Sequence, residues 1–278
     1  MSPARRAIRD GLVVAGLLFA AYLFVVVAPQ ARTVGFDAYA YWSLDLAAPY
    51  ERVAGELGAF PYTPVAARVL APAGLLTWPQ FWVAWTAILV GTLAWLGWRR
   101  ALFVLAFPPV ALELYHGNVH LLMAAAIALG FRYPAAWAFV LLTKVTPGVG
   151  LLWFAARREW RSLGIALGVT AAIGAASLVI DMRLWIDWVT NGLAPVARGV
   201  MSQPNIEIPL LVRLPLAAIV VTWGAWTDRR WAVPLAATLA LPVLWLAGFA
   251  ILAAIPAIGR IGRPERRDLE HLRPETEP

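Results

Sequence analysis

Long apolar blocks separated by short arginine clusters make up most of the chain. Blocks of roughly 18 or more apolar residues are typical of helices that cross a lipid bilayer. Residues 11–28, 79–98 and 163–180 reach that length. We therefore expect an all-α, polytopic membrane protein.

Shorter apolar blocks fill the middle and the end of the chain, and proline, glycine or arginine interrupts them. They cover residues 101–115, 118–131, 134–147, 148–156, 210–226 and, with a break at Pro242, 231–258. Counting them as short or broken helices predicts about ten membrane segments, within a range of roughly eight to eleven. Residues 64–76 contain Arg68 and Pro72, which indicates a helix at the membrane interface rather than a spanning one.

The arginine clusters predict how the chain crosses the membrane. Loops rich in Lys and Arg stay in the cytoplasm, and this places both termini of the chain there. Residues 29–78 and 181–209 then form two extracytoplasmic loops, of which the first carries the interfacial helix. We expect residues 1–258 to form a single domain in the cell membrane, and residues 259–278 to form a charged, disordered cytoplasmic tail.

The composition excludes several classes of protein. Hydrophobic residues make up 61% of the chain and charged residues 14%, whereas about 25% is usual for a soluble domain. A soluble enzyme, a disordered chain and a nucleic-acid-binding module are therefore excluded. Without cysteine and with only three histidines, the chain has no obvious ligand cluster, so we expect no bound metal and no cofactor.

Asp37 is the first candidate for chemistry, because it lies among aromatic residues just after the first apolar block. A carboxylate near the membrane surface is suited to act as a general base. Asp is also a good helix N-cap, here for a helix over residues 38–47. Composition alone favours the N-cap.

Lys144 is the only lysine among 23 basic residues. It lies in an apolar stretch, either at the outer turn of a hairpin of two short helices or midway along one helix over residues 137–156. The charge rule favours the hairpin. There the ammonium is suited to hold a phosphate, or simply to reach the outer lipid headgroups.

Two further polar groups follow the same reasoning, since polar residues at membrane depth mark functional sites by default. His116 and His120 are spaced to share one helical face, but with no third ligand nearby, hydrogen bonding to a polar substrate or capping by Asn118 is favoured over a metal site. Residues 202–207 include Gln203, Asn205 and Glu207. They precede Arg213, which needs an anionic partner, either a phosphate or Glu207.

In this order the motifs resemble the GT-C superfamily of membrane glycosyltransferases, and most closely glycosyltransferase family 87, the polyprenyl-phosphate-mannose-dependent mannosyltransferases. The matching elements are Asp37 with Tyr41, then residues 60–64, 117–119, 144–147 and 157–161, and finally the stretch from Gln203 to Asn205 ahead of Arg213. The family's late Ser-Pro-x-x-Trp-x-His element is present as residues 241–247 without the serine and the histidine.

The resemblance implies a GT-C-like fold and an inverting transfer of a hexose, typically mannose, from a polyprenyl-phosphate-linked donor to a lipid or glycan acceptor at the extracytoplasmic face. It implies that Asp37 is the general base. Substrate binding is then expected at Tyr41, His116, Asn118, Lys144, Gln203, Asn205 and Arg213. The expected partners are the donor, the acceptor and membrane lipids.

Two other classes remain open from the sequence. A lipid or solute transporter is less favoured, because paired repeats with broken helices are typical of that class and none is visible here. A scaffold or an inactive family member would use neither Asp37 nor the cations.

Overall fold

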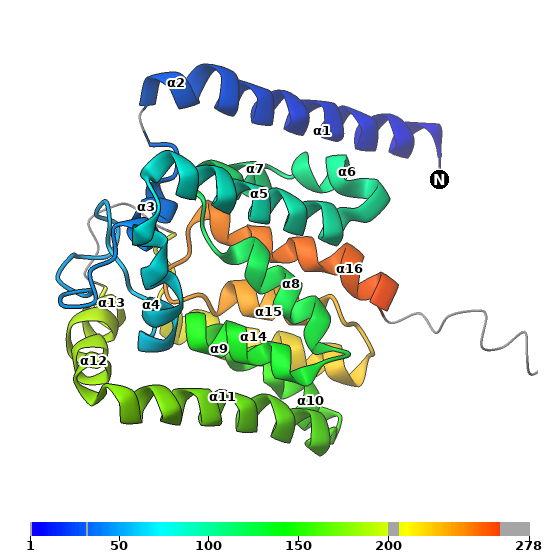
Figure 1. Cartoon of the computed structure of the whole chain (residues 1–278). Helices are drawn as coiled ribbons and strands as arrows, with labels where there is room; N and C mark the ends of the chain where they lie inside the picture. Colours follow the sequence, from blue (N-terminus) through cyan, green and yellow to red (C-terminus); the bar gives the residue numbers. More distant parts are fainter. Residues whose placement is uncertain (1, 32, 200–205, 262–278) are drawn as a thin grey trace, which may run out of the picture.

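A computed structural model describes residues 2–31, 33–199 and 206–261. Within these ranges the chain is helical and contains no β-strand (Figure 1). The all-α expectation is therefore confirmed.

Three helices are long and apolar enough to cross a membrane in the described part of the chain. The first comprises α1 (Pro3–Tyr22), a π-helical turn (Leu23–Val27) and α2 (Ala28–Ala31); the second comprises α5 (Trp78–Gly97), a 3₁₀ turn (Trp98–Arg100) and α6 (Ala101–Leu105); the third is α11 (Trp160–Ile180). Their surfaces carry exposed apolar side chains such as Leu18 and Val179, as expected of helices that face lipid.

Two further helices form a bent pair, which is either one broken span or a re-entrant loop. α7 (Pro108–His116) and α8 (His120–Gly130) together are apolar enough to span, but they meet at 118°. The remaining apolar helices are shorter. They are α9 (Trp137–Thr143) after a 3₁₀ turn (Pro134–Ala136), α10 (Leu152–Ala156) after a 3₁₀ turn (Thr146–Leu151), α14 (Leu210–Trp226), α15 (Ala232–Leu239), and α16 (Ala254–Ile261) after a 3₁₀ helix (Leu246–Ala253).

The core lies around α8. Leu121, Met123 and Ile127 of this helix are fully buried, and α8 contacts α5, α9, α16 and the 3₁₀ helix before α16. α14 and α15 approach closely because small residues face each other, with no room for a Cβ atom on Gly224 beside Ala232. Small residues at helix contacts are typical of membrane bundles. α1 and α11 lie on opposite sides of this core (Figure 1).

The two ends of the molecule differ in chemistry. Four short helices gather at one end, which we call the loop end: α3 (Phe36–Trp42), α4 (Pro64–Leu70) with its 3₁₀ extension (Ala71–Leu75), α12 (Met182–Asp187) with a π-helical turn (Trp188–Leu193), and α13 (Ala194–Ala197) (Figure 1). The predicted interfacial helix over residues 64–76 is thus a real helix. The predicted loop over 181–209 is largely helical up to Ala197.

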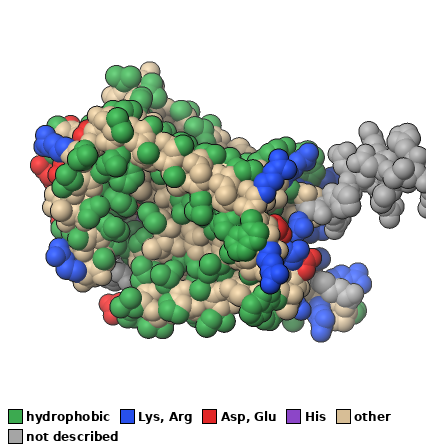
Figure 2. Space-filling view, turned by 90° about the horizontal axis from the view of Figure 1, so that it is seen from below, with side chains coloured by type: hydrophobic (Ala, Val, Ile, Leu, Met, Phe, Trp, Pro, Cys, Tyr) green, Lys and Arg blue, Asp and Glu red, His purple; other side chains and the backbone are tan. Residues whose placement is uncertain are grey.

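Arginines gather at the opposite end, which we call the arginine end (Figure 2). Arg260 donates to the Trp95 and Leu96 carbonyls, Arg157 pairs with Asp228 at 3.0 Å, and Arg230 lies over the Phe131 ring. These contacts bring together turns that the sequence places on one side of the membrane. The prediction of about ten segments is not confirmed, because only three helices of the described residues, or four with the bent pair, have the length and composition to span.

Candidate active site

Hydrogen bonds fix the start of α3, the helix that carries Asp37. Gly35 takes a left-handed conformation (φ 74°) and its amide donates to the Tyr115 carbonyl at 2.8 Å. The Thr33 and Tyr115 hydroxyls are 2.6 Å apart. These bonds attach α3 to the end of α7. Gly35, not Asp37, caps the helix, so the N-cap interpretation of Asp37 is wrong.

The sharp corner between α7 and α8 lies directly behind Asp37. Gly117 has φ 72° and ends α7. A Cβ atom on Gly117 would lie 2.7 Å from the Ala38 Cβ. The Trp85 indole donates to the Gly117 carbonyl at 2.7 Å. Glycine is needed here both for its backbone conformation and for the close approach of α3.

The side chain of Asp37 is mostly buried. Its side chain is 20% exposed, and its Oδ2 atom lies 4.0 Å from Nδ1 of His116. Burial raises the pKa of Asp37 above its ordinary value, while His116, a hydrogen bond from Asn118 and the charge of Lys144 oppose that rise. A carboxyl group balanced in this way is suited to exchange a proton.

Tyr41, Tyr62 and Asn118 form a buried chain of hydrogen bonds that leads to Asp37. The Tyr41 and Tyr62 hydroxyls are 2.9 Å apart, and the Tyr62 hydroxyl donates to Oδ1 of Asn118 at 3.3 Å. Oδ1 of Asn118 also accepts from the Val119 amide at 2.7 Å, and the Asn118 side chain forms a hydrogen bond with Asp37. The chain therefore joins α3, which carries Asp37, to the corner between α7 and α8.

A second buried network holds Lys144. Its Nζ atom lies 2.7 Å from Nε2 of His120, and Nδ1 of His120 lies 2.9 Å from Oε2 of Glu113. With Glu113 as a carboxylate, which only accepts, and Lys144 as an ammonium, which only donates, we assign the His120 proton to Nδ1 and the accepting role to Nε2. Lys144 also lies over the ring of Tyr62, 5.4 Å from its centre, which favours a cation there.

The backbone at Lys144 is extended. α9 ends at Thr143, and Lys144 has φ −134° and ψ 116°. The chain therefore breaks at this residue, which excludes one straight helix over residues 137–156. The Thr63 hydroxyl donates to the Leu142 carbonyl and so joins the start of α4 to the end of α9.

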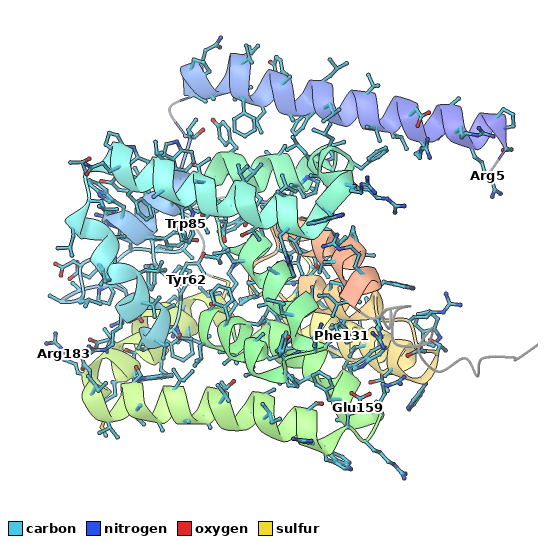
Figure 3. The ribbon with its side chains drawn as sticks, turned by 45° about the vertical axis from the view of Figure 1, so that its right-hand side comes forward. Arg5, Tyr62, Trp85, Phe131, Glu159 and Arg183 are labelled. Carbon is cyan, nitrogen blue, oxygen red and sulfur yellow. The ribbon has the colours of Figure 1, made fainter. Side chains whose placement is uncertain are left out.

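Asp37 and Lys144 line one cavity of about 980 Å³. The cavity lies at the loop end, and one of its lining residues, Tyr62, is labelled in Figure 3. Thr146 and Trp245 are also in its wall. The Thr146 hydroxyl is buried without a hydrogen-bond partner among the described residues. A carboxylate and an ammonium thus line one space, and an unpaired hydroxyl is buried in its wall.

Arg213 lines the same cavity, but its guanidinium is already bonded to the protein. It donates to the carbonyls of Ile208, Leu239, Leu241 and Pro242 at 2.7–3.3 Å. Arg213 therefore pairs with backbone carbonyls rather than with Glu207, and it does not need a phosphate to satisfy its guanidinium. Arg213 ties the start of α14 to the unwound chain after α15.

Several sequence predictions change at this site. His116 and His120 lie on two helices that meet at 118° and so do not share a helical face, and no cluster able to hold a metal occurs in the part of the chain that the structure describes. Tyr41 is fully buried, and Tyr41, His116 and Asn118 are not among the residues that line the cavity. Gln203 and Asn205 lie outside the described residues.

Sequence reasoning missed Glu113 and gave too little weight to His120 and Tyr62. Glu113 is an acid inside an apolar block, which is the usual indication of an intramembrane site. It is fully buried. The amides of His120 and Leu121 also donate to it, at 2.5 and 3.2 Å.

The fold and the site define an all-helical integral-membrane protein in which a carboxylate and an ammonium face one cavity. The family model of glycosyltransferase family 87 matches residues 60–269. Because this match covers more than half of the 278 residues, the chain belongs to glycosyltransferase family 87 and is a membrane glycosyltransferase. Glu113, Lys144 and Arg213 lie within the matched residues, and Asp37 precedes them. No curated protein and no solved structure matches the chain.

Proposed function

We propose that the protein transfers a hexose, mannose in the first instance, from a polyprenyl-phosphate-linked donor to a hydroxyl group of a lipid or glycan acceptor. The observation that carries this proposal is the shared cavity of Asp37 and Lys144. A base and a cation on one space suit a displacement in which an alcohol loses a proton and a phosphate departs.

Asp37 is the general base in this mechanism. It removes the proton of the acceptor hydroxyl, whose oxygen attacks the anomeric carbon. The bond from that carbon to the phosphate oxygen breaks, and the sugar inverts its configuration. His116 and the Asn118 amide orient the carboxylate, as the 4.0 Å contact and the hydrogen-bond chain support.

Lys144 holds the departing phosphate. Its ammonium has three donors, and His120 occupies one of them, so the others are free to bind phosphate oxygens. A phosphate-linked sugar already has a good leaving group, and stabilising the phosphate charge is the main remaining task. Arg213 contributes to the cavity wall, but most of its N–H groups donate to backbone carbonyls.

The cavity opens on the extracytoplasmic side of the cell membrane in this proposal. The arginine end is then cytoplasmic, as the positive-inside rule requires. The polyprenyl chain of the donor lies in the bilayer beside the apolar part of the cavity wall, which includes Leu193, Leu210 and Leu214.

Replacing Asp37 tests the function directly. We expect Asp37→Asn to keep the expression level and thermal stability of the wild type and to lose transfer from a polyprenyl-phosphate-mannose donor by at least about a hundredfold. Asp45→Asn is the matched control, because Asp45 is an exposed acid of the same loop. Undiminished transfer by Asp37→Asn would remove this residue from the mechanism.

A lipid transporter is the main rival function. Liposomes containing the purified protein separate the two, because a transporter moves the lipid-linked sugar between leaflets and releases no glycosylated acceptor. Movement without transfer would favour the rival.

A further inference from the structure

A second cavity of about 520 Å³ lies at the loop end, beside the first. One wall is the loop over residues 47–54, and the other is formed by α12 and the π-helical turn that follows it. Polar side chains line much of it, among them Arg183, Asp187 and Asn191. All of its lining residues belong to the described part of the chain.

Tyr50 lies in the wall of this cavity, and its hydroxyl lacks a partner within the part of the chain that the structure describes. Its side chain is only 5% exposed and lines the cavity. Its hydroxyl is buried and has no hydrogen-bond partner among the described residues. Buried hydroxyls are nearly always paired, because an unpaired one is costly. The hydroxyl has almost no accessible surface in this structure, so the Tyr50 ring would have to shift toward the cavity for a ligand hydroxyl to supply the missing partner.

The second cavity adjoins the one that contains Asp37. Ala54, Pro61, Gly192 and Val196 line both cavities. Gly192 lies at this shared wall, where an added Cβ atom would come within 3.1 Å of the Tyr50 and Trp188 rings. The two cavities therefore share part of one wall.

The chemistry of the wall favours a neutral, polyhydroxylated ligand. Its charged residues are two acids and two arginines, namely Glu51, Asp187, Arg52 and Arg183. Arg183 and Asp187 already form a pair at 3.6 Å, and Arg52 donates to the Leu57 carbonyl. The balanced charge gives a phosphate no net attraction. Carboxylate, amide and phenol groups together suit the many hydroxyls of a sugar.

We propose that the second cavity binds the carbohydrate part of the acceptor, with the Tyr50 hydroxyl and the side chains of Asp187 and Asn191 as its hydrogen-bonding groups. The identification of the ligand as the acceptor rests on the proposed function. The proposal that the cavity binds a neutral sugar rests only on the residues that line the cavity.

Direct binding measurements test the inference without requiring transfer. The full-length protein in detergent is titrated with the methyl α-glycosides of mannose, glucose and galactose, and with inorganic phosphate, and binding is followed by saturation-transfer NMR. We expect saturable binding of at least one methyl glycoside. Inorganic phosphate should compete with that glycoside only weakly. Tyr50→Phe and Asn191→Ala should each weaken that binding roughly three- to tenfold.

Two further variants make the outcome specific. Tyr133→Phe, a change of the same kind at an exposed tyrosine, should bind as the wild type does. Asp37→Asn should also bind the glycoside normally while losing transfer. Failure of the wild type to bind any of the glycosides, equal binding by Tyr50→Phe, or a preference for phosphate would overturn the inference. Glycoside binding that depends on Tyr50 in a protein without transferase activity would instead contradict only the proposed function.

Discussion

Glu113 illustrates how much of the site depends on residues that no substrate touches. It is fully buried, and it bonds both the His120 ring and two backbone amides at the start of α8. Because it fixes the proton on Nδ1 of His120, it leaves Nε2 free to accept from Lys144. We therefore regard Glu113 and His120 as positioning residues for the Lys144 ammonium.

Glu113→Gln tests this role. The amide of glutamine can donate to Nδ1 of His120, and the ring proton then moves to Nε2. A protonated Nε2 cannot accept a hydrogen bond from the Lys144 ammonium. We expect transfer to fall by about a hundredfold, as for a misplacement near 1 Å, with the KM for the donor raised. Glu159→Gln, at the arginine end, is the control. An unchanged KM and kcat in a folded Glu113→Gln protein would show that the network is only structural.

The environment of Asp37 predicts a pH dependence. Burial raises the pKa of this carboxyl and His116 lowers it. The base must be ionised, so kcat/KM should increase with pH through a pKa above the ordinary value of about 3.9. Removing the opposing charge in His116→Ala should move this rise to higher pH. A rise that moves to lower pH, or does not move, would contradict the assignment of the acidic limb to Asp37.

At the scale of elements, the corner between α7 and α8 brings the two halves of the site together. It places His116 and Asn118 behind Asp37, and it starts α8 so that His120 faces Lys144. The corner depends on Gly117, whose left-handed conformation and contact with α3 leave no space for a side chain.

Gly117→Ala should therefore displace α3. We expect a loss of stability of at least about 1–2 kcal/mol from the backbone conformation alone, together with a large loss of transfer. Gly91→Ala in α5 is the matched control, since a Cβ atom at Gly91 meets nothing within 4 Å, and it should leave both quantities near those of the wild type. Thermal unfolding and transfer assays on the two variants decide the point.

The positions of the helices could be predicted closely from hydrophobic blocks. The block over residues 79–98 became α5 (Trp78–Gly97), and the break predicted near Lys144 is present. A hydrophobic block indicates that a helix is present, however, and does not indicate the angle at which one helix follows another. The 118° angle between α7 and α8, and the helices that follow residue 181, depend on glycine conformation and tertiary contacts that periodicity does not encode.

The candidate site was predictable only in part, for the same reason. Asp37 and Lys144 are conspicuous because each is a polar residue near apolar surroundings, and they do share a cavity. Arg213 was equally conspicuous, yet it binds backbone carbonyls. A buried cation needs hydrogen-bond acceptors, but the sequence does not show which acceptors it will find. Tyr50 lies in an ordinary loop sequence, and only its burial without a partner distinguishes it.

At the scale of the whole molecule, polarity separates the two ends. The loop end holds both cavities, while the arginine end ties α5, α10 and α14 to their neighbours through Arg260 and Arg157. A membrane that contains the apolar helices would leave the two ends on opposite sides. The proposed reaction requires that the loop end is the extracytoplasmic one.

Cysteine labelling in whole cells tests that requirement most directly. The chain has no cysteine, so single substitutions at exposed sites report cleanly: Leu57→Cys at the loop end and Arg161→Cys at the arginine end. We predict that a membrane-impermeant maleimide labels Leu57→Cys in intact cells and labels Arg161→Cys only after the cells are permeabilised. Labelling of Arg161→Cys but not of Leu57→Cys in intact cells would place Asp37 at the cytosolic side and contradict the account.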